Sequence, residues 1–410
     1  MNCFQPADIL LPQGVDMNKW AVIACDQFSS EPEYWQRVRA YVGDAPSALH
    51  LIFPEAELRQ EPEKRIAAIK TQMTAYERSG LFRLLENSFV YVERLLSDGT
   101  LRRGLVGRLD LERYDYAAHT DASVRATERT VVERIPPRVR IRENASLELP
   151  HVLLLCDDEE DRILSPLASG RQELLYDLDL MEGGGHIRGW LIRDEAADAL
   201  CGRIEQYEAR TRERYAALSG SPMLYAVGDG NHSLATAKAC YEALRARLGP
   251  EEAKRHPARY ALVELENLHD EAQHFEPIHR IVTQTDVPAL MEAVRRELGA
   301  EEGACLHWVS GNREGELRLD PGLGQIAVGI LQGFLDRWLE KHPGEIDYIH
   351  GEESLRRLAQ KENGIGFLLP KVEKDAFFRS IMADGVLPRK TFSMGSARDK
   401  RYYLEARRIK

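Results

Sequence analysis

The sequence lacks the features of a membrane protein or of a disulfide-rich secreted protein. Its 410 residues contain only six cysteines, at positions 3, 25, 156, 201, 240 and 305, and these form no CxxC pair or other metal-ligand spacing. The strongest apolar run, residues 152–156, is far too short to span a bilayer, and the N-terminal residues show no basic leader followed by an apolar core. We therefore expect a cytoplasmic protein with reduced thiols.

The sequence also lacks the positive charge of a nucleic-acid-binding protein. It has 55 Lys and Arg against 66 Asp and Glu, which gives a formal net charge of -11. Such a surface repels polyanions, so nucleic acid is disfavoured as the main partner, although a local basic pocket could still bind a small anion. Since 43% of the residues are hydrophobic, the chain can bury real cores, and we expect a folded globular protein.

Strand-like and helix-like patterns follow each other along the whole chain. Residues 48–53 predict a strand, residues 61–78 and 194–218 predict helices, and Asp98-Gly99 between two β-rich runs is typical of a hairpin. These patterns predict an α+β fold in which helices flank a mixed sheet. Composition divides the chain into an N-terminal α/β region (1–150), a central region (151–290) and a C-terminal α+β region (291–410), unless all three form one compact unit.

Residues 224–237, LYAVGDGNHSLATA, combine an apolar run, a polar turn and a helical pattern. A turn between a strand and a helix places backbone N–H groups at the positive end of the helix, where Gly230 would let an anion approach closely. Asp229 could bind a magnesium ion or act as general base, and His232 could contact phosphate or carry a proton. Alternatively, Asn231 or Ser233 only caps the helix and Asp229 closes the turn.

Residues 124–142 are rich in arginine in an otherwise acidic protein. Guanidinium groups bind phosphate and carboxylate in bidentate fashion, so this segment could form an anion clamp. Its glutamates, Glu128 and Glu133, could instead neutralise the arginines in a solvated ion network. The arginines are Arg125, Arg129, Arg134, Arg138, Arg140 and Arg142.

Three consecutive glycines, residues 183–185, precede a probable strand at residues 187–192. Such a loop can cradle a phosphate, and His186 and Arg188 would add donors on one strand face. The nucleotide signatures GxGxxG and GxxxxGK[ST] are absent here, so a simple hairpin tip is an equally good interpretation.

Residues 264–280 contain three histidines, at positions 269, 274 and 279, but their spacing is not HExxH, which disfavours a zinc site. The strand that ends near Glu266 and the strand that ends near Asp229 lie either side of one predicted helix. If the two strands pair in parallel, Glu264 or Glu266 lies near Asp229. His279 and Arg280 form a further cationic turn. A GxSxG elbow is absent, which gives little support to a serine hydrolase.

Several stretches together resemble one bacterial family, the domain of unknown function 1015 family. They are WAVIACDQFSSEPEYW, RATERTVVERIPPRVRIREN, LMEGGGHIRGWLI, VGDGNHSLATAKA, FEPIHRIV and LPRKTFSMGSARDKRYYLEARRI, and they follow in the family's order from about residue 9 to residue 409. The family has no established activity, and a link to phosphoserine metabolism is suspected for it.

The turn alone is similar to the DGHHR signature of free serine kinases and related members of the ParB-like superfamily, whose strand-turn-helix unit handles nucleotide phosphates. This resemblance implies that Asp229 is the catalytic or metal-linked acid and that Gly230 and His232 lie at the phosphate. Asn231 and Ser233 depart from the signature, and Ser233 stands where the signature has an arginine. The missing charge would then have to come from Arg125, Arg134 or Arg280.

The sequence thus predicts a phosphoryl-transfer enzyme, a kinase or a phosphohydrolase, that acts on serine, phosphoserine or a similar small amino-acid phosphate. Mg²⁺ and a nucleotide or pyrophosphate donor are the expected cofactors, and a homodimer is an expected assembly. A non-catalytic regulatory protein that senses a nucleotide or phosphate is the alternative. The predicted catalytic residues are Asp229, His232, Glu128 and Glu266, and the predicted binding residues are Gly230, Asn231, Ser233, Arg125, Arg134, Arg138, Gly184, Gly185, His186, His279 and Arg280.

Overall fold

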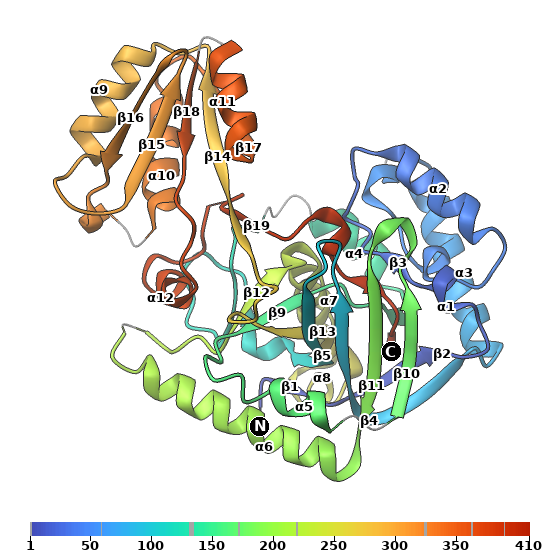
Figure 1. Cartoon of the computed structure of the whole chain (residues 1–410). Helices are drawn as coiled ribbons and strands as arrows, with labels where there is room; N and C mark the ends of the chain where they lie inside the picture. The colour runs from blue at the N-terminus through green and yellow to red at the C-terminus, as the bar shows by residue number, and fades with distance from the viewer. Residues whose placement is uncertain are drawn as a thin grey trace. The chain divides into compact units, whose positions relative to one another are not determined.

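The computed structural model of the chain describes residues 2–58, 60–130, 135–170, 173–218, 220–323, 326–361, 364–388 and 390–410. The chain forms two compact units (Figure 1). The first contains residues 1–126, 130–273 and 395–410, and the second contains residues 127–129 and 274–394. The boundaries predicted near residues 150 and 290 fall at other places than the limits of these units, and they stay predictions.

An eleven-stranded sheet forms the centre of the first unit. Its strands are β1 (Phe4–Gln5), β2 (Ala7–Pro12), β4 (Phe82–Leu95), β5 (Leu101–Asp110), β6 (Tyr114–Asp115), β7 (Val124–Ala126), β9 (Leu153–Cys156), β10 (Glu173–Asp179), β11 (His186–Ile192), β12 (Tyr225–Asp229) and β13 (Tyr260–Asn267). Their order is β10, β11, β4, β5, β13, β9, β12, β7 and β6, with β1 beside β5 and β2 beside β4. Because β9 pairs antiparallel with β12 and parallel with β13, the predicted mixed sheet is confirmed.

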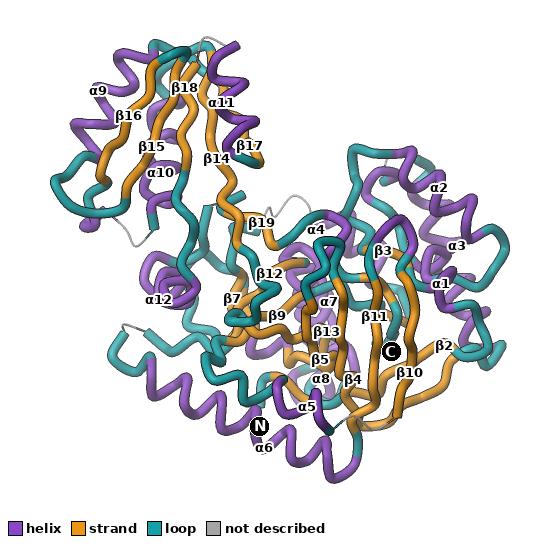
Figure 2. The backbone as a smooth tube through the Cα atoms, viewed as in Figure 1, coloured by secondary structure: helices purple, strands orange, loops and turns teal. Residues whose placement is uncertain are grey.

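Helices cover both faces of this sheet. They are α1 (Met17–Trp20), α2 (Pro32–Val42), α3 (Pro62–Arg78), α4 (Ile135–Arg142), α5 (Ser165–Ser169), α6 (Asp194–Arg214), α7 (Asn231–Leu248) and α8 (Pro250–Ala253) (Figure 2). Neighbouring residues of β4 point to opposite faces, and Tyr91 packs with α6 and α7 whereas Val92 packs with α2 and α3. The sheet therefore has one hydrophobic core on each face.

Two local predictions had different outcomes. The hairpin around Asp98-Gly99 is confirmed, since β4 and β5 pair antiparallel on either side of it. The strand predicted at residues 48–53 is wrong, because residues Ala48–Leu51 form a 3₁₀ helix whose first turn is capped by the Ser47 hydroxyl. Its apolar side chains are buried in the core without joining a sheet, and burial alone produces the apolar run that suggested a strand.

The C-terminal segment returns to the N-terminal half of the first unit. Strand β20 (Tyr402–Tyr403) pairs with β3 (Val22–Ile23), and β21 (Arg407–Arg408) pairs with β8 (Leu147–Glu148). The C-terminal segment is thereby brought beside the residues that follow β3 and the residues between β8 and β9. These three segments are far apart in the sequence, and together with the start of α7 they surround the candidate site.

The second unit is a smaller layered domain. Its strands are β14 (Phe275–Thr283), β15 (Cys305–Ser310), β16 (Arg313–Arg318), β17 (Glu345–His350), β18 (Gly364–Leu368) and β19 (Phe392–Met394), and its helices are α9 (Val287–Leu298), α10 (Ala327–Leu339), α11 (Glu352–Lys361) and α12 (Lys374–Asp384). The sheet order is β16, β15, β18, β14 and β17, with β19 paired to β14. Val282 of β14 packs with α9 and α10, whereas the adjacent Ile281 packs with α11, so this sheet also has helices on both faces.

Two expectations from composition can be compared with this structure. All six cysteines are free thiols. Among the helices that the structure describes, none has both the length and the apolar character needed to cross a membrane.

Candidate functional site

The predicted strand-turn-helix unit is confirmed at residues 225–248. Strand β12 ends at Asp229, Gly230 occupies the N-cap position with φ 78°, and α7 begins at Asn231. The side-chain capping that we considered for Asn231 or Ser233 is wrong, because both residues lie inside the helix and the cap residue is a glycine. The first intrahelical bond runs from the Leu234 N–H to the Gly230 carbonyl at 3.0 Å. The backbone N–H groups that come before Leu234 in the helix have no carbonyl acceptor within it.

Gly230 is required at this turn for two reasons. Its positive φ is unfavourable for residues with a side chain, and a Cβ atom here would lie 3.0 Å from the Val152 Cα and 3.4 Å from the His151 ring. The glycine thus lets the start of α7 approach the segment just before β9. The consequence is a contact between α7 and His151 that the sequence pattern did not reveal.

His151 connects three segments of the first unit. Its Nε2 lies 2.7 Å from the Ser233 hydroxyl, and its Nδ1 lies 2.8 Å from the Tyr403 hydroxyl. Tyr403 also accepts a hydrogen bond of 3.1 Å from the Cys25 backbone N–H. His151 and Tyr403 are both buried. Two tautomers satisfy these bonds: with the proton on Nδ1, Nε2 can accept the Ser233 proton, and with the proton on Nε2, the ring donates to Ser233 instead.

Asp26 adds a negative charge beside this histidine. Its Oδ2 lies 3.8 Å from His151 Nε2. Burial by itself would raise the pKa of Asp26, but His151, the Gln27 side chain and Lys400 outweigh burial and lower this pKa. Asp26 is therefore ionised at neutral pH.

Lys400 supplies the positive charge next to the turn. Its Nζ lies 3.1 Å from Asp229 Oδ2, while Asp229 Oδ1 accepts a hydrogen bond of 3.0 Å from the Gly230 N–H. Both Lys400 and Asp229 are largely shielded from solvent, with side chains 13% and 23% exposed. The pairing of β20 with β3 holds Lys400 in this place, just before β20.

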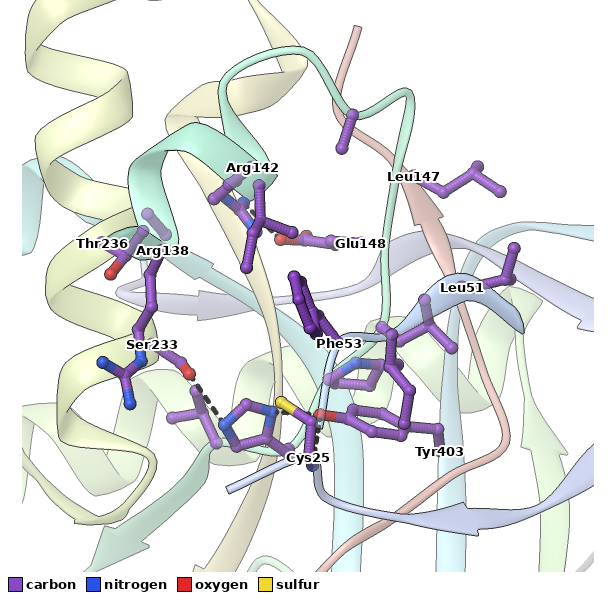
Figure 3. Close-up of a pocket in the computed structure, with 18 of the residues that line it drawn as sticks. Cys25, Leu51, Phe53, Arg138, Arg142, Leu147, Glu148, Ser233, Thr236 and Tyr403 are labelled. Atoms are coloured by element: carbon purple, nitrogen blue, oxygen red, sulfur yellow. Dashed lines mark hydrogen bonds and ion pairs between the residues drawn. The ribbon is translucent and has the colours of Figure 1, made fainter. Parts of the chain in front are cut away.

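A cavity of about 160 Å³ adjoins Ser233 and His151. Its walls are mostly apolar and come from the segment around the 3₁₀ helix Ala48–Leu51, from α4 and from α7 (Figure 3). Four charged side chains also line it, in two ion pairs: Arg138 with Glu55, and Arg142 with Glu148. The cavity is similar in volume to an engineered apolar cavity that binds benzene, so one ring or one branched aliphatic group would fill it.

The arginines that were predicted to form an anion clamp make different contacts in the structure. Arg138 lines the cavity beside Ser233. Arg125 is buried and donates to the carbonyl oxygens of Ala122 and Ser221, so it holds two loops together and does not face the turn. Arg134 lies outside the described residues, as does Glu133.

The glycine triplet forms the turn between β10 and β11. The Gly185 carbonyl accepts from the Leu180 N–H at 2.8 Å, and a Cβ at Gly184 would overlap the Tyr402 hydroxyl at 2.3 Å. His186 lies between two carboxylates, 2.7 Å from Asp177 and 2.7 Å from Asp179. The hairpin-tip interpretation therefore describes this loop.

Arg94 connects that hairpin turn to the segment that carries Lys400. Its guanidinium is buried and donates to the carbonyl oxygens of Gly184, Arg398, Asp399 and Lys400. The glycine loop thus supports the backbone from which Lys400 reaches Asp229. Its contribution to the site is indirect.

The parallel pairing that would have placed Glu266 near Asp229 is wrong. Strand β9 lies between β12 and β13, and β12 runs antiparallel to β9 whereas β13 runs parallel to it. Leu153 of β9 is the register partner of Asp229 on one side and of Glu264 on the other. Glu264 and Asp229 therefore lie at the same level of the sheet, with one strand between them. Glu266 lies further along β13 in a buried ion pair, with 2.9 Å between its carboxylate and Arg102 Nε.

Glu266 should give the stability of the protein a pH dependence of defined sign. Burial raises the pKa of its carboxyl from an ordinary 4.5 to about 7, and Arg102 offsets only part of this rise. Between these values the folded protein binds more protons than the unfolded chain, so the contribution of Glu266 to the free energy of unfolding decreases as pH rises. Urea unfolding gives the free energy of unfolding of the parent protein and of Glu266→Gln at each pH. The parent value minus the Glu266→Gln value should fall from about pH 4.5 to pH 7. Parallel stability profiles of the two proteins would contradict it.

Three other predicted site residues belong to the second unit. Glu128 accepts a hydrogen bond of 3.3 Å from the Thr391 N–H, and the His279 Nδ1 accepts one of 3.1 Å from the Leu369 N–H. Arg280 is buried and donates to Gln332 and to the carbonyl oxygens of Ile278 and Lys390. In this unit the three side chains hold local structure together.

Four residues at the turn were not predicted: Asp26, His151, Lys400 and Tyr403. Asp26 follows an apolar run, and Lys400 and Tyr403 lie in a charged tail, which are unremarkable settings. The available signal was the resemblance of both stretches to one family, which marks segments but does not pair their residues.

Solved structures to which the chain is similar include free serine kinase in complex with AMP, at 11% identity and a TM-score of 0.37, covering 72% of this chain and 89% of that chain. SbnI with C-terminal truncation from Staphylococcus aureus aligns at 10% identity and a TM-score of 0.36, covering 73% and 85%. A conserved hypothetical protein from Pyrococcus furiosus aligns at 10% identity and a TM-score of 0.34, covering 72% and 92%.

These structural likenesses are too distant to assign an activity. No curated protein matches the sequence. A family model described as protein of unknown function (DUF1015) matches residues 10–406, which is nearly the whole chain. The chain therefore belongs to the protein of unknown function (DUF1015) family.

Proposed function

We propose that the protein is a phosphoryl-transfer enzyme, a kinase or a phosphohydrolase, that acts on serine, phosphoserine or a similar small amino-acid phosphate. The observation that supports this proposal is the convergence of Asp229, Lys400 and His151 at the N-terminus of α7. Phosphoryl transfer needs little covalent chemistry from the protein. It depends on positioning and on stabilising charge, which these residues can provide.

The phosphoryl group would bind at the start of α7. The N–H groups of the first helical turn and the helix dipole attract an anion, and Gly230 presents no side chain that would block its approach. Lys400 would exchange its bond with Asp229 for a phosphate oxygen, which frees the carboxylate when substrate is bound. The missing arginine of the turn signature would in this way be replaced by a lysine from the C-terminal segment.

Proton transfer would use the groups behind the turn. Asp229, once released by Lys400, is a general base for a substrate hydroxyl. His151 can exchange a proton with the Ser233 hydroxyl at 2.7 Å, and the Asp26 carboxylate lies 3.8 Å from its Nε2. Ser233 and His232 would hold phosphate oxygens at the first turn.

The predicted Mg²⁺ site does not fit Asp229 as the chain presents it. Both carboxylate oxygens already have protein donors, the Gly230 N–H and the Lys400 ammonium. Asp229 also belongs to neither cluster of metal-binding side chains found among the described residues. Mg²⁺ at Asp229 would require the same departure of Lys400 as phosphate binding. It stays a prediction, and the roles given above to the side chains do not depend on it.

Turnover assays can test the proposal directly. Purified protein would be incubated with phosphoserine, and separately with serine plus ATP, ADP or pyrophosphate, each with and without Mg²⁺. We expect release or transfer of phosphate in one of these reactions, and a loss of at least about a hundredfold in Asp229→Asn because a base and charge partner is removed. Asp44→Asn, an exposed aspartate on the same unit, is the matched control. The proposal fails if no reaction occurs, or if both variants behave alike.

The cavity supports a second candidate, a non-catalytic protein that senses a nucleotide or a phosphate. Its apolar walls and paired charges suit the binding of a planar base beside the anion site. In this case AMP or ADP should raise the melting temperature without turnover, and a larger residue at the cavity wall, Ala237→Leu, should abolish that rise. Turnover of any substrate above would instead favour the enzyme.

A further inference from the structure

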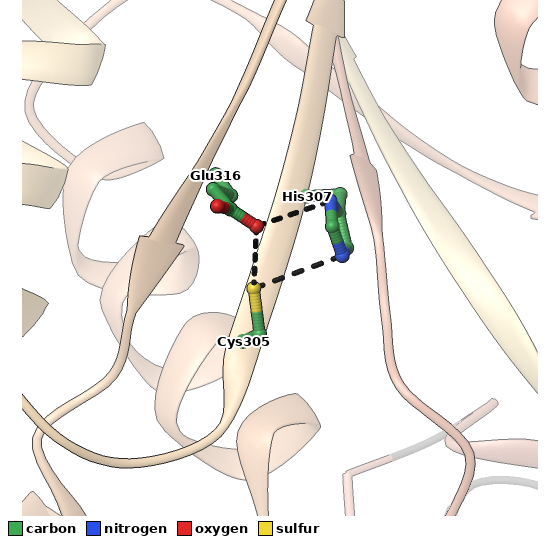
Figure 4. Close-up of side chains that lie close together, drawn as sticks. All are labelled: Cys305, His307 and Glu316. Carbon is green, nitrogen blue, oxygen red and sulfur yellow. Dashed lines mark hydrogen bonds and ion pairs between the residues drawn. The ribbon is translucent and has the colours of Figure 1, made fainter.

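A compact cluster of three potential metal ligands lies in the second unit, outside the site described above. Cys305 and His307 are two residues apart on β15, so both side chains point to the same face of the sheet. Glu316 of β16 is directly opposite His307 in the antiparallel register. The intervening Leu306 is buried in the core on the other face. Cys305, His307 and Glu316 therefore face away from that core together (Figure 4).

The three side chains lie close enough to share one ion, because one ligand atom from each falls within 4.8 Å of the other two. Cys305 Sγ lies 3.7 Å from His307 Nε2 and 3.3 Å from Glu316 Oε2, and His307 Nδ1 lies 3.9 Å from Glu316 Oε2. Tetrahedral Zn²⁺ with its usual bond lengths to sulfur, nitrogen and oxygen separates such ligand atoms by about 3.3–3.6 Å. The two histidine distances use different ring nitrogens and only one nitrogen can bind, so the side chains would have to shift by up to about 1 Å to hold an ion.

The chemistry of the donors selects the class of metal. A thiolate, an imidazole and a carboxylate suit Zn²⁺ and similar borderline-soft ions, whereas Mg²⁺ and Ca²⁺ prefer shells made only of oxygen. We propose that Cys305, His307 and Glu316 bind one divalent transition-metal ion of the Zn²⁺ class. Only one nitrogen of His307 can bind, so the protein supplies three ligands.

The surroundings leave room for a fourth ligand. Cys305 and His307 also line a pocket of the second unit that includes His279 and Glu352, and both ligands are at least partly exposed. Arg318, which is opposite Cys305 in register, donates to the Gly303 carbonyl at 3.3 Å, so this hydrogen bond directs the arginine to a backbone acceptor. Three protein ligands with a water-accessible fourth position is the arrangement of catalytic zinc sites, whereas structural sites have four protein ligands.

Cobalt titration of the full chain tests the proposal without any assay of activity. Co²⁺ added to metal-free, reduced protein should bind with one-to-one stoichiometry, give a thiolate-to-cobalt band in the near ultraviolet and visible bands of tetrahedral intensity, and be displaced by Zn²⁺. Cys305→Ser should abolish the near-ultraviolet band. His307→Gln and Glu316→Gln should each weaken Co²⁺ binding by at least about tenfold.

Cys240→Ser is the matched control, because Cys240 is a partly buried thiol of the first unit. This variant should keep the band and the affinity of the parent protein. The three ligand variants should keep the parent melting temperature without metal, since the cluster lies at the surface. Absence of a thiolate band, or a band that survives Cys305→Ser, would overturn the proposal.

Discussion

Replacing Lys400 with methionine should lower kcat/KM for phosphoryl transfer by about a hundredfold to a thousandfold, the usual cost of removing one preorganised charge from a reacting group. Lys400 is the cation that contacts the turn, at 3.1 Å from Asp229, and its side chain is only 13% exposed. Its charge is therefore weakly screened by solvent. Methionine keeps the length of the side chain and removes the charge, so steady-state kinetics with the substrate identified for the parent protein will isolate this effect.

Two further variants test whether the effect comes from the positive charge of Lys400. Lys400→Arg should recover part of the activity, because it restores the positive charge with a different shape. Lys254→Met removes a lysine that pairs with Glu251 at the surface and should leave kcat/KM unchanged. If Lys400→Met retains activity within about threefold of the parent, Lys400 does not contact the transferring group, since even one such interaction contributes more.

Arg401→Met should lower the free energy of unfolding by about 3–5 kcal/mol, the typical cost of removing one partner from a buried ion pair. The Arg401 side chain is 1% exposed, lies 2.9 Å from Glu264 and also pairs with Glu405. Both glutamates are buried as well. Methionine would leave two buried carboxylates without their cation, and urea unfolding followed by circular dichroism measures the loss.

The chain offers an exposed arginine as control. Arg408 pairs with Glu77 at 3.1 Å, and its side chain is 52% exposed. Arg408→Met should therefore change the free energy of unfolding by at most about 1 kcal/mol. The double variant Arg401→Met with Glu405→Gln should be more stable than Arg401→Met, because one uncompensated charge is removed. Equal losses for Arg401→Met and Arg408→Met would show that burial of this network contributes nothing.

Local patterns gave good predictions where neighbouring residues decide the structure. The apolar run before Asp229, the glycine after it and the helical spacing that follows are sufficient to predict β12, the turn and α7. Pairing between distant strands could not be predicted in this way. Glu264 or Glu266 was expected near Asp229 on the assumption of a direct parallel pair, and β9 instead lies between the two strands.

The candidate site was likewise predicted from local patterns, whereas its contacts with distant segments were not. The sequence identified the turn from the excess of polar side chains around Gly230, but it pointed to arginines of other segments, Arg125, Arg134 or Arg280, as the source of positive charge. Arg125 is instead used to join two loops, and Arg280 is buried in the second unit. Lys400 and Tyr403 reach the turn only because β20 pairs with β3, and His151 reaches it only because Gly230 has no side chain.

The mixed sheet with flanking helices, the hairpin at Asp98-Gly99, the strand-turn-helix unit and the family could all be predicted from the amino-acid sequence. These features depend on hydrophobic periodicity and on residues with special backbone preferences, which are properties of short segments. The charges that surround Asp229 and the side chains of the Cys305 cluster are known only from the folded chain. Those contacts join residues that are distant in sequence or lie on different strands, and burial of the hydrophobic cores fixes them as one arrangement within each unit.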